Sequence, residues 1–137
     1  MKLLWWCCLF LLIGSCQLPE RKVTVNDKST VVYRGVLEKD AQRLGQVLLD
    51  YGYFNTWDER TVYLGKKDKQ FTVTFLLNKE QFLSDQENMV AGFTVWYQWI
   101  RENAFDNAPT LLLLADEQRQ TLYKIDSTTV SSSKSQQ

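Results

Sequence analysis

Two stretches of the chain repeat apolar residues at the spacing of an amphipathic helix. The first covers about 37–51, where these residues come at intervals of 4, 3, 4 and 3: Leu37, Ala41, Leu44, Leu48 and Tyr51. The second covers about 86–104, with one face formed by Met89, Phe93, Trp96, Tyr97, Ile100 and Ala104. Gly52 suits the end of the first helix. Gly45 inside it costs helix stability, so we expect a strand to approach closely there.

Strand patterns fill the remaining body of the chain. Residues 70–77 alternate apolar and polar side chains, the pattern of a strand buried on one face. Residues 61–64 are rich in β-formers, as are 30–35, which 23–25 could extend or flank. Residues 110–115 form a continuous apolar run, consistent with a strand covered on more than one side. Residues 121–125 could return as a last strand.

The order β-α-β-β-α-β predicts an α+β fold. This is the order of the split βαβ, ferredoxin-like plan, in which two helices pack on one face of an antiparallel sheet. The strand at 121–125 would be an extra C-terminal member. The other option is a different small α+β arrangement of the same elements, for instance one in which the last hairpin sets the sheet order. The length, 137 residues, suits a single domain.

The N-terminal segment has the features of a secretory leader. Lys2 precedes an almost unbroken apolar run from Leu3 to Ile13, which is too short to span a bilayer. The sequence Ile13-Gly14-Ser15-Cys16 resembles the lipobox of bacterial lipoprotein precursors, although leucine is commoner at the aliphatic position. Two alternatives are an ordinary cleaved signal that happens to end at a cysteine and an uncleaved membrane-associated segment.

The lipobox resemblance implies the anchor and the address of the mature chain. It implies cleavage before Cys16, which then carries diacylglycerol and an amide-linked acyl chain such as palmitate. Gln17 follows, and lipoproteins without Asp at that place resemble those sorted to the outer membrane in enterobacteria. We therefore expect a signal peptide over 1–15, a lipidated tether over 16–29, one domain over 30–125 and a disordered polar tail over 126–137, facing the periplasm.

Composition excludes several chemistries. The chain has no histidine, which removes the commonest general base and metal ligand. Its cysteines, Cys7, Cys8 and Cys16, all lie in the leader region, so no disulfide or thiolate metal site is expected beyond them. The formal net charge is zero, which argues against a nucleic-acid partner and predicts no polybasic patch for anionic lipid. We expect no cofactor and no metal.

Aromatic residues supply the candidate binding residues. One group is Tyr51, Tyr53, Phe54 and Trp57, and the other is Trp96, Tyr97 and Trp99. Either group could close the core of a small domain or form a recognition surface for a protein or glycan. Trp99 falls off the apolar face of its predicted helix. The residues predicted to contact a partner are Tyr53, Phe54, Trp57 and Trp99.

No catalytic residue is predicted. The acidic pairs Asp58-Glu59 and Asp116-Glu117 could supply two carboxylates, but neighbours in sequence rarely converge on one substrate. Ser29, Ser84 and the tail serines lie in no nucleophile motif. The leading hypothesis is a non-enzymatic binding or assembly module of the envelope. The alternatives are a small carboxylate-dependent hydrolase and an inhibitor or immunity-type lipoprotein. The pattern does not predict an oligomeric state.

Overall fold

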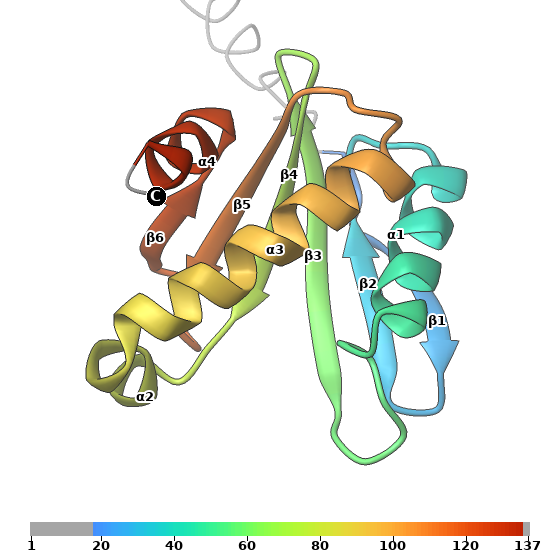
Figure 1. Ribbon diagram of the computed structural model, residues 1–137. Helices are drawn as coiled ribbons and strands as arrows, with labels where there is room; N and C mark the ends of the chain where they lie inside the picture. Colours follow the sequence, from blue (N-terminus) through green and yellow to red (C-terminus); the bar gives the residue numbers. More distant parts are fainter. Residues whose placement is uncertain (1–17, 136–137) are drawn as a thin grey trace, which may run out of the picture.

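The strands of the domain lie side by side in the order of the sequence. The computed structural model describes residues 18–135. Its elements are β1 (Arg21–Asn26), β2 (Ser29–Tyr33), α1 (Glu38–Asp50), β3 (Arg60–Lys67), β4 (Gln70–Leu76), α2 (Lys79–Ser84), α3 (Gln86–Ala104), β5 (Thr110–Ala115), β6 (Thr121–Ile125) and α4 (Ser127–Lys134). The six strands form one sheet, ordered β1-β2-β3-β4-β5-β6, and α1 and α3 lie across one of its faces (Figure 1).

The predicted α+β class is confirmed, but the predicted antiparallel sheet is wrong. β2 pairs with β3 in parallel, as β4 does with β5, and the other neighbours are antiparallel. The ferredoxin-like order would place another strand between the two strands that each helix connects. Here α1 and α3 return the chain to the position directly beside the strand just left, which makes each pair parallel. Hairpins then add β1 and β6 at the two edges.

Both ends of the folded part extend past the predicted boundaries at 30 and 125. β1 lies within the predicted tether and is the flanking strand that was left open for 23–25: Val23 and Val25 face the core, and the strand pairs along β2. α4 lies within the predicted tail. It forms a helix there because Asp126 caps it, accepting from the backbone N–H groups of Thr128 and Thr129. The short helix α2 was not predicted, and Asn78 caps it. The leader and Cys16 lie outside the described residues.

The core lies between the sheet and the helices. Along β4 the predicted alternation is present, and the buried side chains all face α1 and α3: Phe71, Val73 and Phe75. Burial of this face is the main source of stability. Gly45 confirms the expected close approach, since a Cβ built there would lie 2.5 Å from Cγ2 of Val25 on β1.

Candidate binding surface

Four aromatic side chains gather where the end of α1 meets the middle of α3. We call them the aromatic cluster: Tyr51, Tyr53, Trp96 and Trp99. Tyr51 is the C-cap residue of α1, whereas Trp96 and Trp99 lie three residues apart on α3 and so share one side of that helix. The helices α1 and α3 pack side by side (Figure 1). This packing brings members of the two aromatic groups of the sequence into contact.

The rings of the cluster contact one another in favourable geometries. Tyr51 stacks on Trp99, with centroids 4.6 Å apart and planes 17° from parallel. Trp96 meets Trp99 edge to face at 5.3 Å and 85°. Such pairs each add about 0.5–1.5 kcal/mol beyond the area that they bury. Tyr51 is 41% exposed, and both tryptophans are half-buried. The cluster is therefore a rigid aromatic surface that water still reaches.

Tyr53 connects this surface to the core. Its ring lies 5.8 Å from Trp96 and 4.9 Å from the fully buried Phe75. The Arg60 guanidinium lies 4.7 Å above the ring and donates a hydrogen bond to the Tyr53 carbonyl oxygen at 3.0 Å. Burial raises the pKa of Tyr53, against the opposing effect of the Arg60 charge. Tyr53 thus stays a neutral, fixed support beneath the tryptophans.

The other two predicted contact residues have different surroundings. Phe54 is 2% exposed and belongs to the core, so it offers no surface to a partner. Trp57 is 82% exposed on the loop between α1 and β3. There the backbone carbonyl oxygen of Trp57 accepts a hydrogen bond from the Lys28 ammonium at 3.1 Å, and its backbone N–H donates one to Asn55 Oδ1. The prediction omitted Tyr51 and Trp96 from the contact residues, although the three-residue spacing of Trp96 and Trp99 could have indicated a shared surface.

The acidic pairs lie in two separate loops. Asp116 is 5% exposed, and its Oδ1 accepts hydrogen bonds from the backbone N–H groups of Gln118 and Gln120, both at 2.9 Å. This carboxylate shapes the β5–β6 turn. Asp58 lies in the α1–β3 loop, 3.6 Å from the Arg60 guanidinium. Asp58 and Asp116 therefore each have a local structural partner.

Within residues 18–135, no three metal-ligating side chains come together. Among those same residues, no helix has the length and apolar character needed to cross a membrane.

Comparison with known families places most of the folded part in a family domain. The model of a family N-terminal domain, AF_1994_N, matches residues 22–127. The matched range runs from β1 to the start of α4 and so includes the whole sheet. No curated protein and no solved structure matches the chain.

Proposed function

The chain belongs to the AF_1994_N family, and we propose that it is a lipid-anchored protein of the bacterial envelope that binds another envelope component. The anchor is Cys16, acylated after removal of residues 1–15. Its support is the sequence Ile13-Gly14-Ser15-Cys16 behind an apolar run. Two or more acyl chains hold a protein stably on a bilayer, whereas one holds it only marginally. Gln17 supports attachment to the outer membrane, with the domain in the periplasm.

The observation that carries the binding role is the Tyr51–Trp99 stack on the surface between two helices. Tryptophan and tyrosine are the residues most enriched in binding hot spots, because they offer a large contact area with little side-chain entropy to lose. Here the rings already hold one another in place, and Tyr53 fixes them to the core. A partner therefore meets a surface that is ordered before binding.

The partner is an envelope protein or a glycan. Both classes bind well to exposed aromatic faces that are bordered by hydrogen-bonding groups. Gln46 and Asp50 are exposed polar residues near the end of α1, which leads into Tyr51, and the Gln46 amide donates to the Asp50 carboxylate at 2.7 Å. The proposed action is non-covalent: the anchor holds the domain at the membrane and the aromatic cluster holds the partner.

Crosslinking in intact cells tests the binding role. We expect a photoreactive residue at Asn103, which is exposed one turn beyond Trp99 on α3, to capture a defined partner. Trp99→Ala or Tyr51→Ala should weaken capture by about 10-fold or more, as a single hot-spot residue does. Trp57→Ala removes an equally large but separate side chain, so capture should persist. Equal loss from Trp57→Ala and Trp99→Ala, or unchanged capture by both cluster variants with normal melting temperatures, contradicts this site.

Maturation tests the anchor separately. Cys16→Ser and globomycin treatment should each leave a precursor that retains the leader. Mass spectrometry of the untreated protein should show acyl chains on an N-terminal Cys16. Normal processing under both conditions, or an unmodified residue 16, would remove the anchor from the proposal.

A further inference from the structure

The end of the domain that follows Cys16 in sequence carries exposed apolar and cationic side chains. The described chain begins at Leu18, which is 60% exposed, and enters the sheet at Arg21. Two residues span at most about 7 Å, so an acyl group on Cys16 must lie close to Leu18. The β2–α1 loop and the β3–β4 hairpin reach this same end (Figure 1). We call it the anchor-proximal end.

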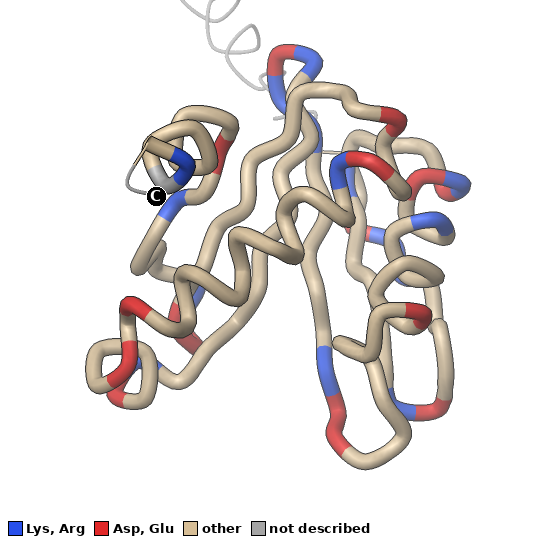
Figure 2. The backbone as a smooth tube through the Cα atoms, in the orientation of Figure 1, with Lys and Arg blue, Asp and Glu red and all other residues tan. Residues whose placement is uncertain are grey.

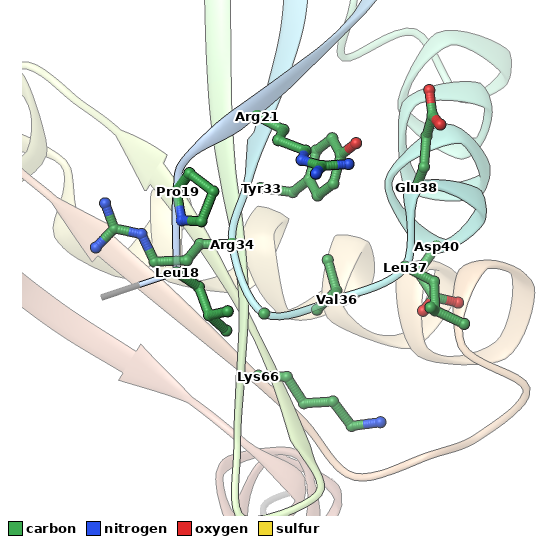
Figure 3. A pocket seen from close by; sticks show the side chains of 11 residues that line it. Leu18, Pro19, Arg21, Tyr33, Arg34, Val36, Leu37, Glu38, Asp40 and Lys66 are labelled. Atoms are coloured by element: carbon green, nitrogen blue, oxygen red, sulfur yellow. The ribbon is translucent and has the colours of Figure 1, made fainter. Parts of the chain in front are cut away.

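A hollow of about 480 Å³ opens at this end, between Leu18, the β2–α1 loop and the start of α1. Three cationic side chains line it: Arg21, Arg34 and Lys66. Leu18 and Leu37 lie on opposite sides of the hollow, and the Lys66 side chain extends along its edge between them (Figure 3). Leu37 is 61% exposed. Apolar side chains beside cations suit the boundary between lipid headgroups and acyl chains.

The local charge differs from the neutral balance of the whole chain. The β3–β4 hairpin carries Lys66, Lys67 and Lys69 around a single acid, Asp68. Figure 2 shows basic (blue) segments on both sides of the acidic (red) segment at the tip of this hairpin. Acids are present as well. Glu38 and Asp40 line the α1 wall of the hollow, and Glu20 pairs with Arg34 at 3.4 Å. The excess of positive charge is small and lies mainly on the hairpin.

We propose that the anchor-proximal end docks directly on a bilayer that contains anionic phospholipid. Leu18 and Leu37 enter the interface, while Lys66 and Lys69 contact lipid phosphates. This inference rests on the proposed lipidation of Cys16. A small charge excess is sufficient because the anchor already holds the domain at the surface, which makes docking an intramolecular step at high effective concentration. The net charge of the whole chain does not indicate the anchor-proximal end, because the fold brings its residues together from β1, β2, β3 and α1.

Docking would set the direction in which the aromatic cluster faces. α1 runs from the hollow to Tyr51 over 13 residues, a length of about 20 Å at the helical rise. The β1–β2 turn at Asp27 lies at the opposite end of the sheet from the β3–β4 hairpin (Figure 1). A docked domain therefore holds Tyr51 and Trp99 away from the membrane, where a partner can reach them.

Site-specific quenching in vesicles tests the docking. Beyond Cys16 the chain has no cysteine, so Lys67→Cys and Asp27→Cys each give one labelling site on the mature lipidated protein. Each is labelled with bimane and reconstituted in phosphatidylglycerol-containing vesicles with doxyl-labelled lipid. We expect about three-fold stronger quenching or more at position 67 than at 27, because docking brings the β3–β4 hairpin to the doxyl lipids and holds the β1–β2 turn at the opposite end of the sheet.

A variant that removes both positive charge and an apolar side chain from the anchor-proximal end separates docking from tethering. Lys66→Gln with Lys69→Gln and Leu37→Ser should equalise the quenching at 67 and 27, as should vesicles of phosphatidylcholine alone. The matched control, Lys28→Gln with Lys79→Gln and Leu83→Ser, changes the same residue types elsewhere and should leave the difference intact. Equal quenching at both positions in a protein that floats with the vesicles overturns the docking but keeps the anchor. Failure to float overturns the lipid anchor itself.

Discussion

The two faces of the sheet differ sharply in what covers them. On the face under α1 and α3, Val62, Val73 and Phe75 are fully buried. On the opposite face, Tyr63 and Thr74, which lie across from each other in β3 and β4, remain partly exposed. Burial of apolar area contributes about 25 cal/mol per Å², so the covered face dominates stability. The open face is free to carry other groups.

Long charged side chains lie on the open face. The Arg119 guanidinium lies 3.8 Å above the Tyr63 ring and 3.6 Å from the Glu20 carboxylate. Glu20 also pairs with Arg34 at 3.4 Å, so this chain of charges connects the β5–β6 loop with the start of β1. These groups are about half exposed, and exposed pairs contribute little. The comparison therefore predicts large effects of mutation on one face and small effects on the other.

The strongest test uses two adjacent leucines of β5. Leu112 is fully buried under the helices, whereas Leu113 is half-buried on the open face. We expect Leu112→Ala to lower the free energy of unfolding by about 2–5 kcal/mol, because it removes contacts and leaves a cavity. Leu113→Ala should lower it by about 1 kcal/mol, since water already reaches the side chain. Urea unfolding of both variants measures the difference. Equal losses would mean that something covers the open face in solution.

A second prediction concerns the tightest contact on the covered face. Gly45→Ala gains about 1 kcal/mol of helix propensity, but the new methyl group would lie 2.5 Å from Cγ2 of Val25. Overpacking costs about 1–3 kcal/mol, so we expect a net loss of about 1 kcal/mol in thermal or urea unfolding. In a Val25→Ala background the obstruction is gone, and the same substitution should stabilise the protein. A loss of equal size in both backgrounds would place the strain elsewhere.

Sequence periodicity predicted the elements better than their arrangement. Residues 86–104, 110–115 and 121–125 form a helix and two strands with the predicted bounds, because the spacing of apolar side chains is a local property. The strand order was wrong, since alternation shows which side chains are buried but not which strand lies beside another. α4 was assigned to the tail, and β1 was left only as an option for 23–25, because short polar-rich segments acquire their structure from pairing and capping.

The candidate site follows the same division. Trp99 could be identified from its angle on α3, outside the apolar face. Its stacking partner, Tyr51, depends on the packing of α1 against α3, which no local pattern reports. Phe54 was expected to contact a partner, but it lies in the core because the chain turns inward after α1, where its N–H donates to the Leu48 carbonyl at 2.9 Å. Aromatic composition alone does not distinguish these two places.

The smallest expected effect lies on the open face, at Arg119. Its guanidinium stacks on Tyr63 while the side chain remains 51% exposed. An exposed cation–π contact contributes about 0.5–1 kcal/mol, so Arg119→Ala should reduce the free energy of unfolding by about 0.5 kcal/mol. Because Tyr63→Leu removes the same contact, the double variant should lose less than the sum of the two single losses. Strict additivity in urea unfolding would show that the two groups do not interact in solution. A loss near that of Leu112→Ala would instead show that the open face shares the structural role of the covered one.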